Sequence, residues 1–105
     1  MWYYIKNRKW GEIVNINKTT IKIYYYIKNY IKEHDYSPSM REVQKMIKLK
    51  SPATVKYHIN KLIDLGFIKV DYDKKGTIIA RSIKITNSKE NDIILKKMSE
   101  LKEEI

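Results

Sequence analysis

Two histidines, His34 and His58, are the side chains in this sequence best suited to acid–base or metal chemistry. They lie far apart in the chain, and the absence of cysteine excludes thiolate chemistry and Cys-ligated zinc. A catalytic His58 would need a nucleophile or carboxylate within hydrogen-bond reach, but Asp64 lies almost two helical turns away. The three glycines form no phosphate-binding loop. We therefore expect no enzyme, no cofactor and no metal site, and a structural or phosphate-facing role for His58.

Positive charge is the more informative chemistry of this chain. Its 22 Lys and Arg residues outnumber 12 Asp and Glu residues, which gives a net charge of +10. Residues 1–85 hold 18 basic and 7 acidic side chains, a net of +11, whereas residues 86–105 hold 4 and 5, a net of −1. This distribution favours a polyanionic partner for the first segment and a different role for the second. A solvated, lysine-rich surface is the alternative.

The length of 105 residues predicts one domain. The sequence contains neither an apolar run as long as a membrane span nor the pattern of a signal peptide, so we expect a cytoplasmic protein with no membrane partner. We expect residues 1–18 to form an arm or hairpin, residues 19–86 a helical unit with a second hairpin, and residues 87–105 a terminal helix.

The segment 1–18 is rich in aromatic and basic side chains. The β-forming stretches 2–6 and 12–16 flank residues with turn composition, which predicts a hairpin; an irregular arm is the alternative. Such an arm could stack on bases or follow a groove, with Arg8, Lys9 and Trp10 as candidate contacts. Alternatively, its Trp and Tyr side chains close a core or a dimer interface.

Two helices with recognisable start signals are predicted before residue 50. Thr19 or Thr20 can cap the first, which ends before Pro38. Ser39 and Glu42 form a capping box at the start of the second. Apolar residues at helical spacing predict the buried faces, namely Ile23, Tyr24, Ile27, Tyr30 and Ile31 in the first helix and Val43, Met46 and Ile47 in the second.

A third helix is predicted with both of its ends marked. Ser51 is its N-cap, Pro52 occupies its first position, and Gly66 ends it with the backbone freedom that a helix terminus needs. Its buried stripe is Val55, Ile59, Leu62 and Ile63. Strands at 67–70 and 77–85, joined by a turn at 73–76, are predicted to follow.

The last segment, 87–105, is predicted to be an amphipathic helix capped by Ser88. Ile94, Met98, Leu101 and Ile105 recur at spacings of four, three and four, a pattern typical of a coiled-coil seam. The seam could dock on the domain or pair with a second copy. We favour pairing into a homodimer, because DNA operators are commonly read by two-fold dimers.

Three helices followed by a β-hairpin form a winged helix-turn-helix, an α+β fold. The stretch "YSPSMREVQKMIKLKSPATVKYHINKLIDLGFIKVD" resembles the N-terminal DNA-binding domain of the bacterial SOS repressor LexA. The shared marks are the aromatic-Ser-Pro lead, "RE" followed by an apolar residue, "SP" opening the third helix, His58 followed by an apolar residue, and "L..LG.I" into the wing. The resemblance covers about residues 20–85. It implies DNA binding, but not the family's serine–lysine self-cleavage, because the residues after the wing do not supply that site.

In helix-turn-helix proteins the N-terminal part of the second motif helix enters the major groove. Removing the buried stripe from the third helix leaves the candidate DNA contacts Ser51, Ala53, Thr54, Lys56, Tyr57, Asn60 and Lys61, of which the resemblance implies that the first five read bases or adjacent backbone. Ser39 and Arg41 at the start of the second helix and Lys74, Lys75 and Arg81 in the wing are further candidates. Because the front of the third helix lacks Arg and Gln, we expect shape readout of AT-rich DNA to matter as well.

We therefore expect a homodimeric protein that binds specific double-stranded DNA, and we favour a small transcriptional regulator of a plasmid or phage. An accessory protein of a plasmid replication or conjugative-transfer origin fits the same residues. For either DNA-binding role, a polymerase or an origin-processing enzyme is the candidate protein partner. A third hypothesis is a protein-interaction module with no specific DNA site.

Overall fold

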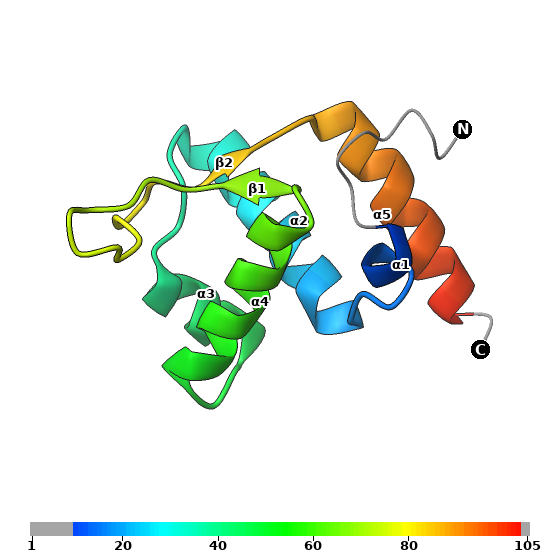
Figure 1. The fold of residues 1–105 in the computed structure, drawn as a ribbon, viewed down its shortest axis with the longest axis horizontal. Coiled ribbons are helices and arrows are strands. Elements are labelled where there is room, and N and C mark those ends of the chain that lie inside the picture. The colour runs from blue at the N-terminus through cyan, green and yellow to red at the C-terminus, as the bar shows by residue number, and fades with distance from the viewer. Residues whose placement is uncertain (1–9, 104–105) are drawn as a thin grey trace.

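The computed structural model describes residues 10–103, and within them the long helices surround one hydrophobic core (Figure 1). Helix α2 (Lys18–His34) lies at the centre and packs against α3 (Met40–Ile47), α4 (Pro52–Asp64) and α5 (Ser88–Glu103). Helices α3 and α4 also pack against each other, as the two helices of a helix-turn-helix motif do. The predicted helices are thus present in the predicted order.

The short elements complete a winged helix-turn-helix. Strand β1 (Ile68–Lys69) pairs antiparallel with β2 (Lys84–Ile85), and the chain between them forms the wing, which projects away from the helices (Figure 1). The four-residue helix α1 (Trp10–Ile13) precedes α2. The α+β fold class is therefore confirmed.

The N-terminal prediction is wrong where the structure describes it. Residues 12–16 form no strand: α1 ends at Ile13, and a tight turn follows in which the Ile16 N–H donates to the Ile13 carbonyl (3.0 Å). Both isoleucines are fully buried, so this stretch belongs to the core and is not an arm. The predicted strand at 2–6 and the candidates Arg8 and Lys9 lie outside the described residues.

Helix α2 begins two or three residues earlier than predicted. Asn17 is its N-cap, since its Oδ1 accepts the Thr19 N–H (2.7 Å), whereas Thr20 lies inside the helix and is buried. At the other end Asp35 adopts a left-handed φ of 65°, and its N–H donates to the Ile31 carbonyl. The predicted caps Thr19 and Thr20 are therefore replaced by Asn17.

The start signals of α3 and α4 are confirmed. Ser39 Oγ accepts the Glu42 N–H (3.1 Å) and Glu42 Oε1 accepts the Ser39 N–H (2.8 Å), which is the complete capping box. Ser51 caps α4 ahead of a proline, and Gly66 takes a left-handed φ of 83° just after the helix. On α3, Met46 is 60% exposed and does not join the predicted buried face.

The wing has less regular pairing than predicted. The ladder holds only Ile68 opposite Ile85 and Lys69 opposite Lys84, with an isolated bridge farther out. Arg81, at a left-handed φ of 56°, interrupts the predicted strand 77–85. The predicted turn at 73–76 is present.

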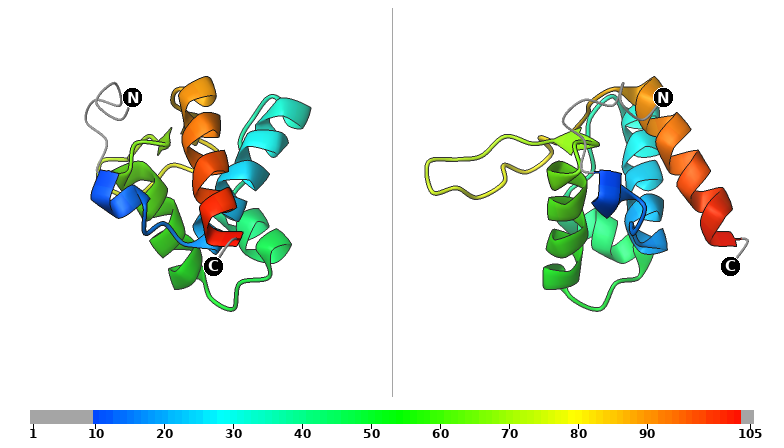
Figure 2. Two further views of the ribbon diagram at one scale, coloured as in Figure 1. Left: turned by 90° about the vertical axis from the view of Figure 1, so that its right-hand side faces the viewer. Right: turned by 45° about the vertical axis from the view of Figure 1, so that its right-hand side comes forward.

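Helix α5 runs along α2 on the side of the molecule opposite the wing (Figure 2). Ile94 and Met98 are 3% and 2% exposed and join the core of this chain. The prediction that they pair with a second copy is therefore wrong, because they are already covered. Leu101 is exposed, and Ile105 lies outside the described residues. Asn87, not Ser88, caps the helix, since its Oδ1 accepts the Glu90 N–H (3.2 Å).

Candidate nucleic-acid interface

The outer face of α4 carries a stripe of exposed side chains. Ala53, Lys56, Tyr57 and Asn60 are spaced by three, one and three residues, so they share one side of the helix. The opposite side packs into the core. Four of the seven predicted contacts on this helix are thus brought together on a surface that is free to enter a groove.

The other three predicted contacts on α4 are engaged within the protein. The hydroxyls of Ser51 and Thr54 are hydrogen-bonded to each other (2.9 Å), and Ser51 Oγ accepts the Thr54 N–H (3.2 Å). Lys61 Nζ lies 3.5 Å from Glu12 Oε1, on the side of α4 that faces α1. Lys61 is therefore turned away from the exposed stripe. The hydroxyl of Ser51 serves as the N-cap of α4.

His58 is buried and anchors α4 to α2. Its Nδ1 lies 2.7 Å from Thr20 Oγ1, in a contact that the protein shields from solvent. Burial lowers the pKa of His58, because desolvation disfavours the charged imidazolium. The side chain has the structural role that was one of the two alternatives, and it does not face a phosphate.

The wing lies beside the N-terminal end of α4. A cleft of about 220 Å³ separates them and is lined by Met40 from α3, Pro52 and Lys56 from α4, and Thr77 and Ile78 from the wing. Three elements that are distant in the sequence thus meet around the exposed stripe. The sequence analysis predicted that α3, α4 and the wing each contact DNA. It did not predict that Lys56 of α4 would line a cleft together with residues of α3 and the wing.

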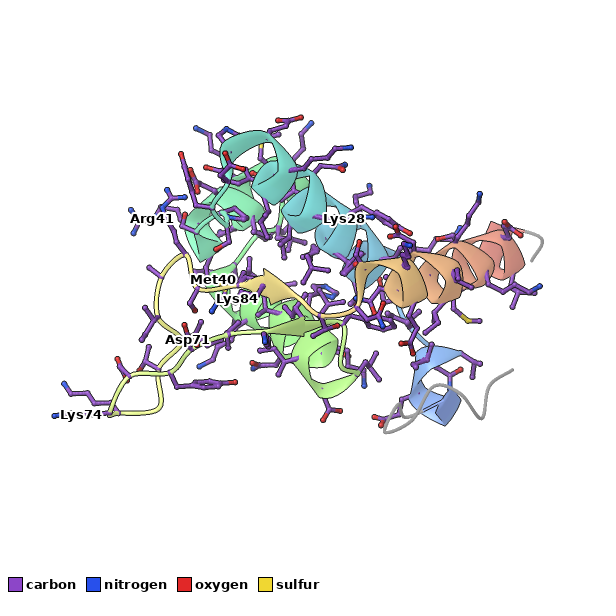
Figure 3. The ribbon with its side chains drawn as sticks, turned by 90° about the horizontal axis from the view of Figure 1, so that it is seen from above. Lys28, Met40, Arg41, Asp71, Lys74 and Lys84 are labelled. Carbon is purple, nitrogen blue, oxygen red and sulfur yellow. The ribbon has the colours of Figure 1, made fainter. Side chains whose placement is uncertain are left out.

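The tip of the wing presents two lysines to solvent. Asp73 Oδ1 accepts the N–H groups of Lys75 (2.8 Å) and Thr77 (2.9 Å), which fixes the turn, and Gly76 has a left-handed φ of 82°. Lys74 and Lys75 are both exposed. Figure 3 shows Lys74 at the outer end of the wing, with Arg41 on the same side of the molecule and α5 on the opposite side.

Arg81, which was predicted to contact DNA, is instead engaged within the protein. Its guanidinium lies 3.0 Å from Glu42 Oε1, donates to the Ser37 carbonyl (3.0 Å) and sits 5.1 Å from the centre of the Tyr36 ring. The pKa of Glu42 lies below its usual range, because the Ser39 N–H and, to a smaller extent, the Arg81 guanidinium stabilise the carboxylate. The prediction that Arg81 contacts DNA is therefore corrected. In the structure this residue links the base of the wing to α3.

Ser37 was missed as a positioning residue. It is 2% exposed, and its Oγ accepts the Ile83 N–H (3.2 Å) while its carbonyl accepts from Arg81. A proline disfavours the helical conformation at the residue before it, so Pro38 keeps α3 from starting at Ser37, whose hydroxyl and carbonyl bond to the returning segment of the wing. The Ser-Pro pair in the sequence was the available signal.

Arg41 contributes to a basic hollow that the sequence reasoning also missed. It is exposed at the start of α3, and the hollow continues along α3 to the turn before α4. Ser39, the other candidate here, is half-buried and occupied by the capping box. The signal for the hollow was the spacing of Arg41, Lys45 and Lys48, which places them on one face of a helix.

Among residues 10–103, none of the helices combines the length and apolar character needed to cross a membrane. In the same part of the chain, no three His, Asp or Glu side chains gather in a way that could hold a metal ion.

An exposed polar helix, supported by two others and flanked by a basic wing, defines the class of protein as a winged helix-turn-helix. The family model of the LexA DNA binding domain matches residues 17–77, which is more than half of the chain. The chain belongs to the LexA DNA-binding domain family.

Several relatives are named LexA repressor. The one from Clostridium kluyveri is 44% identical over 62 residues, which are 59% of this chain and 31% of the relative. Those from Staphylococcus haemolyticus and Staphylococcus aureus are 34% identical over 79 residues, which are 75% of this chain and 36% of each relative. The chain spans about a third of the length of these curated relatives.

Proposed function

We propose that this chain binds specific sequences in double-stranded DNA and acts as a transcriptional regulator, with repression the favoured direction because the relatives are named repressors. The observation that carries the proposal is the exposed stripe of α4 beside the wing. Lys56, Tyr57 and Asn60 are exposed on one side of this helix, and the opposite side is buried in the core. A helix held in this way fits the major groove.

The contacts divide by chemistry. Lys56 can donate to guanine O6 or N7, Asn60 can bond an adenine edge, and Ala53 can contact a thymine methyl group, so the stripe is suited to base readout. Lys74 and Lys75 at the wing tip are suited to phosphate or minor-groove contact, which adds affinity with little sequence information. We assign recognition to α4 and most of the remaining charge-driven affinity to the wing.

The proposal includes a homodimer on a two-fold site. With Ile94 and Met98 buried, the apolar residues that α5 leaves exposed are Ile93 (69%) and Leu101 (46%), and these become the candidate dimer contacts. Sedimentation of the specific complex should give two chains per duplex. The plasmid or phage setting and the origin-accessory alternative depend on where the bound sites lie, at promoters or at an origin.

The test compares native and random DNA. Footprinting on the encoding replicon would supply the native site, and titrations at moderate salt would compare it with a random duplex. We expect the native site to bind on the order of 1,000-fold more tightly or better. Equal binding of both duplexes would contradict the proposal and favour the protein-interaction hypothesis.

Two matched double variants test the division of roles. Replacing Lys56 and Tyr57 by Ala should reduce the preference for the native site by about 1–3 kcal/mol, because base contacts are lost. Replacing Lys74 and Lys75 by Ala should weaken both duplexes about equally and lower the salt slope by about 2. The opposite ranking would assign recognition to the wing.

A further inference from the structure

We propose that Arg81 and Glu42 are positioning residues for DNA binding, because their contact at the base of the wing fixes the direction in which the wing points. This inference rests on the proposed function and adds to it the residues that hold the wing in place. Neither side chain needs to touch DNA. Both act through Lys74 and Lys75, which are exposed at the wing tip.

The direction of the wing is set near its base. Residues 71–77 are exposed, and this outer part of the wing projects away from the helices (Figure 1). Apolar packing begins at Val70 and Ile78, which lie partly buried against the core. Polar contacts with the helical part are concentrated at Arg81 and Ile83, where the wing returns to the two-stranded ladder. A rotation at this base therefore moves the tip farther than it moves the base itself (Figure 3).

Arg81 reaches three segments of the helical part. Its Nη1 lies 3.0 Å from Glu42 Oε1 in α3 and donates to the Ser37 carbonyl in the link before α3 (3.0 Å). The same nitrogen lies 3.4 Å from the Tyr30 hydroxyl in α2, and the guanidinium sits 5.1 Å from the centre of the Tyr36 ring. Contacts with three segments fix the guanidinium more tightly than a single ion pair would.

Glu42 is itself held in place by the helices. Its Oε1 accepts the Ser39 N–H (2.8 Å) in the capping box, and its Oε2 accepts the Tyr30 hydroxyl (3.4 Å). The carboxylate is therefore oriented by groups that do not belong to the wing. Helix α3, which carries Glu42, packs against α4. The contact between Glu42 and Arg81 thus links the wing to the pair of helices that carries the exposed stripe.

This link sets the spacing between the wing and α4. The cleft of about 220 Å³ between them has Lys56 of α4 on one side and Thr77 and Ile78 of the wing on the other. Because Lys56 and the two tip lysines must reach the same duplex, the spacing across the cleft decides whether they can bind it together. An exposed ion pair contributes little to stability, so we expect its loss to affect DNA binding more than folding.

Two variants disrupt the contact and change the net charge in opposite directions. Glu42→Gln removes a negative charge and keeps a side chain that suits the capping box. Arg81→Asn removes a positive charge, and asparagine tolerates the left-handed φ of 56° at this position. If only net charge mattered, Glu42→Gln would strengthen DNA binding and Arg81→Asn would weaken it. We expect both variants to weaken it, because both loosen the wing.

The measurement is the dependence of affinity on salt, with native and random duplexes. Each variant is prepared with and without the double change Lys74→Ala and Lys75→Ala, so that a double-mutant cycle gives the coupling between the base of the wing and its tip. In the wild type the double change should lower the salt slope by about 2. In Glu42→Gln and in Arg81→Asn we expect it to lower the slope by less than about 1.

The affinity itself gives a second readout. Loss of one phosphate contact corresponds to roughly fivefold in affinity at about 0.15 M salt. We expect Glu42→Gln and Arg81→Asn each to weaken both duplexes by about this factor or more, with little change in the preference for the native site. Urea midpoints of all variants would show that each chain is folded under the conditions of the titrations.

A second surface ion pair supplies the matched control. Glu12 of α1 lies 3.5 Å from Lys61 of α4, on the side of the molecule away from the wing (Figure 1). Glu12→Gln removes a paired carboxylate and changes the net charge by the same amount as Glu42→Gln. We expect Glu12→Gln not to weaken DNA binding and to leave the effect of the wing lysines on the salt slope at about 2.

Three results would overturn the proposal. The first is an equal effect of the two lysine changes on the slope in the wild type and in either variant, and the second is no effect in the wild type. The third is stronger DNA binding by Glu42→Gln, since net charge would then explain the result. If the wild type prefers no native fragment, the proposed function fails, but the slopes on random duplex still decide whether Arg81 and Glu42 position the wing.

Discussion

Helices α4 and α5 are built alike on their inner faces. Each buries three apolar side chains and one polar side chain in the same core, and each polar side chain bonds to a neighbouring segment. In α4 the polar residue bonds to α2, and in α5 it bonds to the residues that flank β1 and β2. The buried sets are Val55, His58, Ile59 and Leu62 in α4 and Asn91, Ile94, Leu95 and Met98 in α5.

The outer faces of the two helices differ. From its N-cap to Lys61, α4 has no acidic residue, and its exposed stripe combines lysine, tyrosine and amide groups. Helix α5 intersperses its lysines with carboxylates, one of which, Asp92, pairs with Lys28 of α2. The inner face of each helix therefore fixes its position in the fold. Of the two outer faces, that of α4 lacks, as far as Lys61, the carboxylates that would repel a polyanion.

The largest effect should come from the inner face of α5. Replacing Ile94 by Ala should lower the free energy of unfolding by about 2–5 kcal/mol, because the side chain is buried in the core of its own chain. The matched change Leu101→Ala, at a position exposed in the single chain, should cost the folded monomer less than about 0.5 kcal/mol. Urea titrations monitored by circular dichroism would measure both.

This pair can break the comparison. If Ile94→Ala leaves the stability of the monomer unchanged and instead reduces the mass in sedimentation, the inner face of α5 pairs with a second copy and is unlike that of α4. A loss of stability without a change in mass would sharpen the comparison.

The docking of α5 could not be deduced from its pattern. A repeat of Ile94, Met98 and Leu101 is the same whether the partner is a second helix or the chain's own core, so spacing alone does not identify the partner. The docking position of α5 depends on the space that α2 leaves open, and that space is a property of the tertiary fold. Local signals were more informative: the Ser39–Glu42 capping box, the Ser51–Pro52 start of α4 and the wing turn are all present.

The candidate site was predictable where it depends on one helix. Periodicity separated Lys56 and Tyr57 from the buried stripe correctly. It could not show that Arg81 would meet Glu42, because that contact joins segments 39 residues apart in the chain. Asn17 and Asn87 were overlooked as caps because neighbouring Thr and Ser residues offered equivalent hydroxyls.

A smaller effect is expected from the buried polar residue of α5. Asn91 is fully buried, and its Nδ2 donates to the Phe67 carbonyl (3.0 Å) and to Thr86 Oγ1 (3.2 Å). Asn91→Ala should cost about 1–3 kcal/mol, because it removes these bonds and leaves a small cavity. Thr86→Ala, at an exposed residue, serves as the comparison and should cost less. A chain that tolerates Asn91→Ala without loss of stability would show that α5 is positioned by its apolar side chains alone.

The smallest effect should separate α4 from α5 by pH, because among the residues of the two helices whose burial the structure describes, the one buried titratable group, His58, lies in α4. Burial lowers the pKa of His58 in the folded chain, so the unfolded chain binds more protons as the pH falls through the ordinary histidine pKa of about 6.5. The stabilisation that depends on neutral His58 is therefore complete above that pH and is lost progressively below it, until the folded form is also protonated.

His58→Gln tests this directly, since an amide can still bond Thr20 Oγ1 but does not titrate in this range. We expect the wild type to lose more stability than this variant between pH 7.5 and pH 5.5, as measured by urea midpoints, and His34→Gln at an exposed position to behave like the wild type. Equal losses for all three proteins would mean that the histidine under α4 does not link folding to protonation. In that case the buried polar residues of α4 and α5 would differ in chemical type but not in their effect on stability.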